Sequence, residues 1–98
     1  MDAKERHQLI DTLLGKTVDI VIDRPIGYVH ITKDYRITYP VNYGYIPGVL
    51  GGDGEDIDVY LLGIKEPVTK YSAKIIGAVR RLDDVEDKVY TRDLFRRD

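Results

Sequence analysis

Hydrophobic residues recur every three or four positions along the first fifteen residues of the chain, which is the spacing of one face of an α-helix. These hydrophobic residues are Leu9, Ile10, Leu13 and Leu14. Asp2 precedes Glu5 by three positions, as in a capping box, and Gly15 stands where a helix commonly ends. The pattern predicts an N-terminal helix over residues 1–15, whose single apolar edge covers part of a larger body.

After this helix the hydrophobic period changes to two, which is typical of β-strands. Val18, Ile20 and Ile22 alternate with Thr17, Asp19 and Asp23 along the segment and predict a strand with one buried face. Further strands are expected at residues 28–31, 35–38, 59–64, 73–80 and 86–91. Residues 32–34 suit a hairpin turn. The segment 39–54 is rich in glycine, proline and tyrosine, which favours a long ordered loop.

The succession of short strands with turn residues between them favours a small β barrel, closed or nearly closed, after one helix. A parallel α/β sheet is a poor alternative because no crossover helices separate the strands. The chain has 98 residues, enough for one compact domain and too few for two. We therefore expect residues 1–98 to form a single, mainly β domain.

The composition narrows the chemistry that is open to the chain. There is no cysteine, so disulfides and thiolate metal sites are excluded, and there are two histidines, His7 and His30. Any metal must be held mainly by oxygen atoms, as Mg²⁺, Mn²⁺ and Ca²⁺ are. A net charge of −2 argues against a general nucleic-acid binder. The lack of a long apolar stretch or an apolar signal core predicts a cytoplasmic protein without a membrane span.

Four carboxylates fall within six residues, just before an apolar strand. They belong to Asp53, Glu55, Asp56 and Asp58. Clustered carboxylates repel one another unless a cation neutralises them, and Mg²⁺ takes one or two of them directly. Two such ions could activate a water molecule and hold a phosphate. A solvated acidic turn and a calcium loop are the alternatives, although Asp58 occupies the place of the EF-hand glycine.

A second acidic group, residues 83–87, lies before the last expected strand. On an extended strand Asp84, Glu86 and Lys88 share one face. A carboxylate pair beside an ammonium group can hold a metal ion and a phosphate oxygen together. A charged hairpin end explains the same residues equally simply.

The segment 39–45 reads Tyr-Pro-Val-Asn-Tyr-Gly-Tyr and does not have the pattern of a buried core. The hydroxyls of Tyr39 and Tyr43 can donate to phosphate oxygens, and Asn42 can hold the segment by bonding to backbone groups. Aromatic packing over one end of a barrel is the alternative role of the tyrosines. A phosphate ligand also needs cations, and the candidates are Arg24, Lys33, Arg36, Arg80, Arg81 and Lys88.

Two of these segments together resemble the soluble family I inorganic pyrophosphatases. The Tyr-Pro-x-Asn-Tyr-Gly sequence is followed by Asp53-Gly-Glu-Asp-Ile-Asp58, similar to the family signature of acidic residues at the first, third and sixth positions. Residues 86–88 resemble the second metal-and-phosphate segment of the family, and residues 21–25 resemble the strand that begins its active site. The resemblance runs from about Lys16 to Tyr90.

The resemblance implies a five-stranded barrel of OB type that hydrolyses pyrophosphate to two phosphates with Mg²⁺. The metal ligands that it implies are Asp53, Asp58, Asp84 and Glu86. The catalytic residues are Glu55, at the position of an aspartate that assists the attacking water, with Asp53 and Tyr43. The substrate contacts that it implies are Tyr39, Tyr43, Lys88 and Lys33, with Arg36 as the alternative to Lys33 in place of a family arginine.

The sequence also departs from the family pattern. Glu55 is longer than the usual aspartate, and Val29 and His30 stand near the positions of a family lysine and glutamate. Family members continue into a C-terminal helix beyond the position of Asp98, and the apolar surface left open predicts a homo-oligomer. The alternative functions are a Mg²⁺-dependent phosphate or pyrophosphate binder with weak or no turnover, and a structural OB-type barrel.

Overall fold

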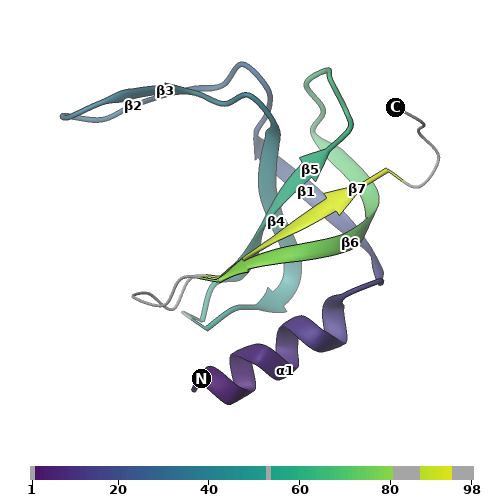
Figure 1. Cartoon of the computed structure of the whole chain (residues 1–98). Coiled ribbons are helices and arrows are strands. Elements are labelled where there is room, and N and C mark those ends of the chain that lie inside the picture. Colours follow the sequence, from purple (N-terminus) through teal and green to yellow (C-terminus); the bar gives the residue numbers. More distant parts are fainter. Residues whose placement is uncertain (1, 53, 81–86, 94–98) are drawn as a thin grey trace.

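Five strands close into a barrel in the computed structural model of the chain, which describes residues 2–52, 54–80 and 87–93 (Figure 1). Their order around the barrel is β1 (Thr17–Arg24), β4 (Asn42–Leu50), β5 (Asp56–Leu62), β7 (Asp87–Arg92) and β6 (Lys70–Arg80). Strands β5 and β7 pair in parallel and the other neighbours pair antiparallel. The barrel and the helix before it confirm the expected fold class.

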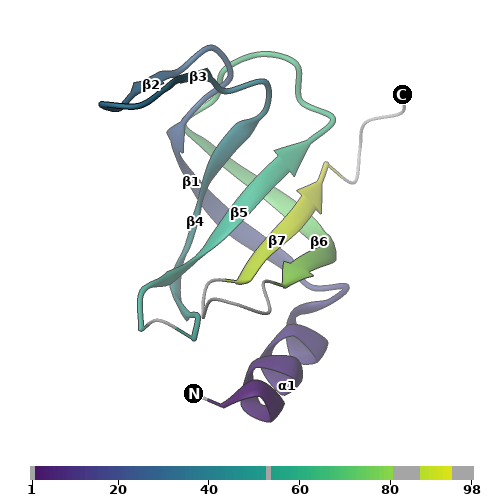
Figure 2. The same cartoon turned by 60° about the vertical axis from the view of Figure 1, so that its left-hand side comes forward.

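Helix α1 (Ala3–Leu13) lies below one end of the barrel (Figure 2). Its first turn is capped by Asp2, whose carboxylate accepts a hydrogen bond of 2.8 Å from the backbone N–H of Glu5. The backbone then passes through Gly15 with a φ of 82°, which favours glycine. Ile10 and Leu13 are buried in the same hydrophobic core as the barrel strands. The helix is therefore part of the domain core and confirms the N-terminal prediction.

Alternation of side chains divides the barrel wall into an inner and an outer face. The inner face carries buried aliphatic residues, among them Ile20, Val59, Leu61, Ile75 and Val89. Because successive residues of a strand point to opposite faces, their neighbours along the strands point outward. Three of the residues expected to carry chemistry, Tyr43, Asp58 and Lys88, are on this outer face.

Gly44 allows β1 and β4 to approach each other closely. A Cβ atom on Gly44 would lie 1.9 Å from the carbonyl oxygen of Val21, so no larger side chain fits. Next to this point Ile22 pairs with Gly44 and Arg24 pairs with Tyr43, which leaves one extra residue in β1. This β-bulge moves Arg24 away from the face on which Ile22 is buried, whereas a regular strand would put both on one face.

Asn42 joins the start of β4 to two neighbouring segments. Its side chain is fully buried; Oδ1 accepts a hydrogen bond of 3.0 Å from the N–H of Ile26 and Nδ2 donates one of 3.0 Å to the carbonyl of Glu66. Both polar ends of the amide are thus satisfied inside the protein. The expected role of Asn42 in holding its segment is confirmed.

A two-stranded hairpin of β2 (Val29–Ile31) and β3 (Arg36–Thr38) projects from the barrel (Figure 1). In its turn, the hydroxyl of Thr32 accepts hydrogen bonds from the N–H groups of Asp34 and Tyr35. Strands β2 and β3 pair with each other in a separate two-stranded sheet. The two short strands and the turn between them confirm the expected hairpin.

The expectation of a loop over residues 39–54 is wrong in its larger part, because β4 occupies Asn42–Leu50. Tyrosine and valine suit a strand, and the glycine that suggested a loop is needed where β1 and β4 meet. No helix in the described residues has the length and apolar character needed to cross a membrane.

Candidate active site

Two rows of side chains cross the outer face of β4, β5 and β7. One row consists of Tyr45, Asp58 and Lys88, and the other of Tyr43, Tyr60 and Tyr90. Each row follows the strand register, in which Asp58 pairs with both Tyr45 and Lys88 while Tyr60 pairs with both Tyr43 and Tyr90. The inward-facing valines between them are fully buried, so the two rows face outward.

Lys88 connects the two rows through hydrogen bonds. Its ammonium group donates to the hydroxyl of Tyr43 at 2.7 Å and to Oδ2 of Asp58 at 3.2 Å. Nζ also lies 5.0 Å from the centre of the Tyr43 ring. The ring centres of Tyr43 and Tyr60 are 5.0 Å apart, and those of Tyr60 and Tyr90 are 5.4 Å apart. The ammonium group of Lys88 therefore lies beside the Tyr43 ring, which in turn packs against Tyr60.

A second cation and hydroxyl pair comes from β1 and the end of the hairpin. Nη1 of Arg24 donates to the hydroxyl of Tyr39. The guanidinium carbon lies 5.4 Å from the centre of the Tyr39 ring and 6.0 Å from that of Tyr28. The rings of Tyr39 and Tyr43 are 5.5 Å apart, so the two pairs are neighbours.

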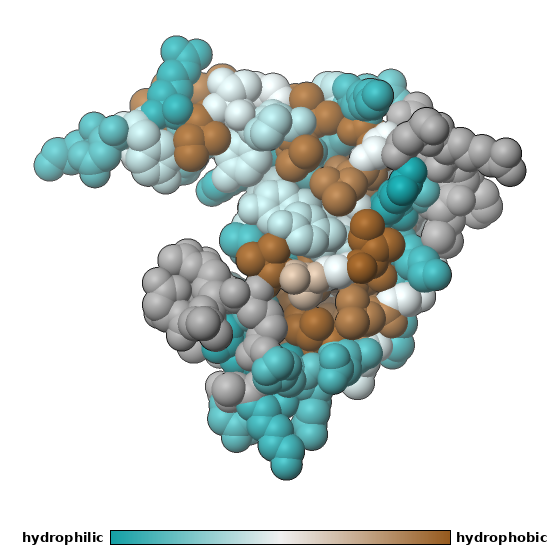
Figure 3. Space-filling model, viewed as in Figure 1, coloured by the Kyte–Doolittle hydropathy of each residue, from teal (hydrophilic) through white to brown (hydrophobic). Residues whose placement is uncertain are grey.

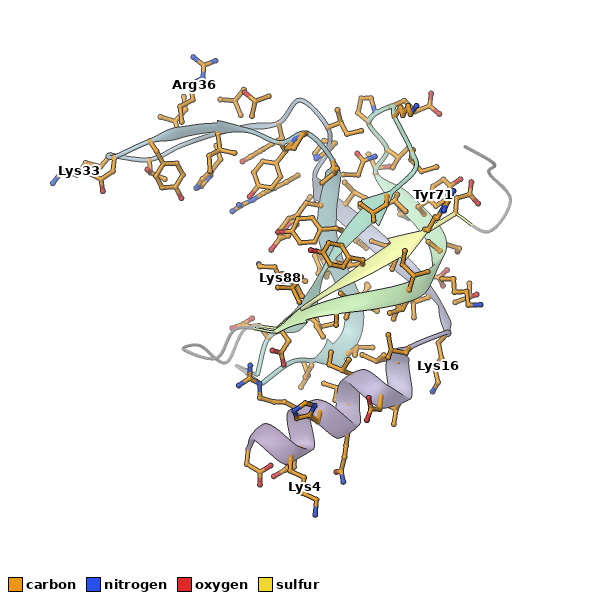
Figure 4. All side chains as sticks on the ribbon, in the orientation of Figure 1. Lys4, Lys16, Lys33, Arg36, Tyr71 and Lys88 are labelled. Carbon is orange, nitrogen blue, oxygen red and sulfur yellow. The ribbon has the colours of Figure 1, made fainter. Side chains whose placement is uncertain are left out.

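Together these side chains surround a pocket of about 350 Å³. Its lining residues are Asp23, Arg24, Tyr39, Tyr43, Asp58, Tyr60 and Lys88. The surface is hollowed beneath the projecting hairpin on the face shown in Figure 3, and Lys88 lies on the barrel wall below the hairpin (Figure 4). We call this the phosphate pocket, because cations and phenol hydroxyls are the groups that bind phosphate oxygens.

A second pocket, of about 360 Å³, adjoins the first at Asp58. It is lined by Tyr45, Leu50, Gly54, Glu55, Asp56 and Asp58, and we call it the acidic pocket. The carboxylate of Asp56 accepts a hydrogen bond of 3.2 Å from the N–H of Gly48 and so ties the start of β5 to β4. Asp58 is the residue shared by the acidic pocket and the phosphate pocket.

The surroundings of Tyr43 and Lys88 fix their protonation at neutral pH. Burial raises the pKa of Tyr43 to about 12; the hydrogen bond from Lys88 opposes this shift and Asp58 adds to it. Burial acts to lower the pKa of Lys88, but its hydrogen bonds to Tyr43 and Asp58 outweigh that effect and raise it. The phenol is therefore neutral and the ammonium group charged, so that both can serve an anionic ligand.

The structure brings together four of the residues singled out in the sequence. Tyr39, Tyr43, Asp58 and Lys88 line the phosphate pocket, and Glu55 lines the adjoining acidic pocket. Lys33 lies instead at the tip of the hairpin, far from Lys88 (Figure 4). Its position there does not support the expected substrate contact.

Three of the expected metal ligands, Asp53, Asp84 and Glu86, lie outside the described residues. Within the described part of the chain there is no group of three or more acidic, histidine or cysteine side chains placed to hold a metal ion. Asp58 is the member of the expected ligand set that can be located, on the wall between the two pockets. The roles of the other three stay predictions.

Sequence analysis left three pocket residues outside the chosen site, namely Asp23, Arg24 and Tyr60. Arg24 was one of several candidate cations, and no local pattern indicates the bulge that moves it to the pocket. Tyr60 lies in a strand that was read as uniformly apolar. Its spacing of two from Asp58 is the signal that could have identified it, because residues two apart share a face of a strand.

Comparisons with known proteins identify the family of the chain. The family model described as inorganic pyrophosphatase matches residues 11–89. Inorganic pyrophosphatase of Haemophilus influenzae is 40% identical over 55 residues, 51% of this chain and 31% of that protein. Soluble inorganic pyrophosphatase 2 of Chlamydomonas reinhardtii is 32% identical over 83 residues, 80% of this chain and 43% of that protein. The chain thus spans less than half the length of these curated relatives.

The fold has solved counterparts. The crystal structure of an inorganic pyrophosphatase from Neisseria gonorrhoeae superposes with a TM-score of 0.63 and 24% identity, covering 85% of this chain and 58% of that one. The structure from Ehrlichia chaffeensis gives a TM-score of 0.60 and 21% identity, covering 82% and 62%. At this identity the structures establish the barrel architecture, while the family model covers most of the sequence. The chain therefore belongs to the inorganic pyrophosphatase family.

Proposed function

We propose that this chain hydrolyses inorganic pyrophosphate to two phosphates in a Mg²⁺-dependent reaction. The observation that carries the proposal is the phosphate pocket, where Lys88, Tyr43, Arg24 and Tyr39 converge beside Asp58 in a chain of the pyrophosphatase family. Pyrophosphate is highly anionic, so its hydrolysis depends mostly on neutralising charge and positioning the reacting groups.

Four side chains of the phosphate pocket bind and orient the substrate in this proposal. Lys88 and Arg24 supply positive charge to the phosphoryl oxygens. Tyr43 and Tyr39 accept hydrogen bonds from these cations and so hold the cationic groups at the wall of the pocket. The binding groups are therefore held in place before the substrate arrives, which lowers the cost of ordering them.

The donor set suits Mg²⁺. Asp58 and Glu55 offer carboxylate oxygens in adjoining pockets, and the chain has no cysteine that would favour a softer metal. We propose Asp53, Asp58, Asp84 and Glu86 as the residues that hold the ions. When bound, Mg²⁺ supplies charge neutralisation and makes water a stronger acid. Glu55, in the acidic pocket, is proposed to accept the proton from the attacking water, with Asp53 beside it along the chain.

The test is release of phosphate from pyrophosphate by the purified 98-residue chain with Mg²⁺. We expect turnover, and we expect Asp58→Asn to abolish it while thermal unfolding shows an intact fold. The matched control is Asp11→Asn, which makes the same chemical change at an exposed position of α1. Near-normal turnover in Asp58→Asn contradicts the proposed role of this carboxylate.

A wild-type chain that releases no phosphate contradicts the proposed hydrolysis. Thermal stabilisation by pyrophosphate and Mg²⁺ together then decides whether the pocket binds without turnover. If neither turnover nor stabilisation is found, the barrel has a structural role instead.

We also propose that the protein is a cytoplasmic homo-oligomer. The support for the oligomer is a set of large apolar side chains that are exposed, many of them on the projecting hairpin. The hairpin members are Tyr28, Val29, Ile31, Tyr35 and Ile37. Light scattering at increasing protein concentration tests the oligomeric state, and a constant monomer mass contradicts the proposed oligomer.

A further inference from the structure

Arg6 and Asp87 form a buried, two-pronged ion pair between the N-terminal helix and the first residue of β7. Nε of Arg6 donates to Oδ2 of Asp87 at 3.0 Å, and Nη2 donates to Oδ1 at 2.6 Å. Arg6 is 8% exposed and Asp87 is 5% exposed. The pair therefore links residues 81 positions apart in the sequence at a place shielded from water.

Stability alone is a weak reason for such a pair. Removing two charges from water is costly, and apolar residues of similar size often serve equally well in a protein interior. What the ion pair adds is geometry, because the planar guanidinium meets the carboxylate in one orientation. A buried two-pronged pair therefore fixes the direction as well as the position of the strand that carries it.

The position of the pair relates it directly to the phosphate pocket. Asp87 immediately precedes Lys88, and the two side chains point to opposite faces of β7. Lys88 is the first residue of β7 in register with β5, where it pairs with Asp58, whereas Asp87 pairs with Arg80 of β6. The start of β7 therefore has two contacts on opposite faces. The side chain of Lys88 reaches Tyr43 and Asp58 on the outer face, and Asp87 is held by Arg6 of α1 on the other face.

We propose that the Arg6–Asp87 pair is a positioning device, which holds the start of β7 so that the ammonium group of Lys88 stays between Tyr43 and Asp58. Arg6 and Asp87 do not touch the ligand and act through Lys88. The kinetic part of this inference rests on the proposed pyrophosphate hydrolysis, and the geometric part does not.

The geometric part is tested by NMR on the metal-free and ligand-free chain. Because Nζ of Lys88 lies 5.0 Å from the centre of the Tyr43 ring, the ring current displaces the methylene signals next to Nζ from those of exposed lysines. The Lys88 signals are assigned by their loss in Lys88→Arg. We expect Arg6→Lys, which keeps the charge but loses the two-pronged contact, to return them toward the exposed position.

The matched control is Leu13→Ala, which removes a buried side chain of the same helix without removing the ion pair. We expect it to lower the unfolding temperature while leaving the Lys88 signals in place. If Arg6→Lys unfolds, the double variant Arg6→Met/Asp87→Leu restores packing without charge and is expected to release Lys88 in the same way. Unchanged Lys88 signals in the folded variants overturn the inference.

The kinetic part is tested by a double-mutant cycle. We expect Arg6→Lys to lower kcat/KM for pyrophosphate about tenfold in the wild-type background, as for a small misplacement of a binding group. In the Lys88→Ala background the same substitution should change kcat/KM less than about twofold, because the group that it positions is gone. Equal effects in both backgrounds overturn the inference. If the wild-type chain releases no phosphate, the proposed function fails, and the NMR comparison still decides the positioning role.

Discussion

The hydroxyl oxygen of Tyr43 lies 2.7 Å from Nζ of Lys88, although 45 residues separate them in the sequence. The two are on β4 and β7, which do not pair directly and are bridged by β5. Their contact depends on the register of two strand pairs, one antiparallel and one parallel. The phosphate pocket is thus built on the rigid wall of the barrel, which suits a site that must hold charged groups in place.

Removal of the Tyr43 hydroxyl should weaken catalysis more than folding. We expect Tyr43→Phe to lower kcat/KM for pyrophosphate about tenfold to a hundredfold, the range for losing a hydrogen bond to a charged group. The ring and its contact with Tyr60 remain, so the unfolding temperature should change little. Steady-state kinetics and thermal unfolding measure the two effects. The matched control is Tyr35→Phe on the exposed hairpin, which should leave kcat/KM unchanged.

Arg24 should contribute to substrate binding as the second cation of the phosphate pocket. We expect Arg24→Gln to raise KM for pyrophosphate about tenfold, through loss of charge-assisted contacts to phosphate oxygens. The control is Arg36→Gln, because Arg36 lies on the projecting hairpin and points away from the barrel (Figure 4). The KM values of the two variants are compared at fixed ionic strength. A larger effect at Arg36 than at Arg24 would contradict the assignment of the pocket.

Stability of the metal-free protein should fall as the pH rises above 10. The folded state raises the pKa of Tyr43 from 10.0 to about 12, so it keeps a phenol proton that the unfolded chain loses in this interval. The folded state then binds more protons than the unfolded state, and the free energy of unfolding decreases with pH. The raised pKa of Lys88 acts in the same direction. The charged Lys88 stabilises the folded state at pH values below its ordinary pKa, and this stabilisation is lost as the pH rises above that pKa.

Urea unfolding at a series of pH values between about 8 and 11 measures this decline, over the range where tyrosine and lysine ionise. We expect a shallower decline in Tyr43→Phe, because the phenol that ionises is absent. The control is Tyr35→Phe, for which the decline should match that of the wild type. A decline in Tyr43→Phe as steep as in the wild type would mean that other groups cause it.

Hydrophobic periodicity predicted the helix and most strands because these elements pack one face on a common core. Ile20 and Ile22, two positions apart and both buried, are an example of this packing. The bulge before Arg24 could not be predicted, because it depends on the close approach of Gly44 from another strand. Local sequence carries no information on such a contact.

The candidate site was predictable where acidic or tyrosine residues follow a spaced motif. Tyr39, Tyr43, Asp58 and Lys88 were chosen in this way and do line one pocket. Lys33 lies away from this pocket, at the tip of the hairpin, because the direction of the hairpin determines where its turn lies. That direction is not visible in the pattern of the turn itself.

Replacement of Gly44 should destabilise the barrel more than replacement of another strand glycine. The Cβ of Gly44→Ala would lie 1.9 Å from the carbonyl oxygen of Val21 and 2.8 Å from Cα of Ile22, and both are backbone atoms that cannot rotate away. β1 and β4 must separate to accommodate the methyl group, so we expect a loss of at least about 3 kcal/mol in the free energy of unfolding. The matched control is Gly77→Ala in β6, whose Cβ would meet its nearest neighbour, the Tyr90 ring, at an ordinary 3.8 Å. Gly77→Ala should fold with near wild-type stability in urea titrations, and equal losses in the two variants would show that the close approach of β1 and β4 does not limit this position.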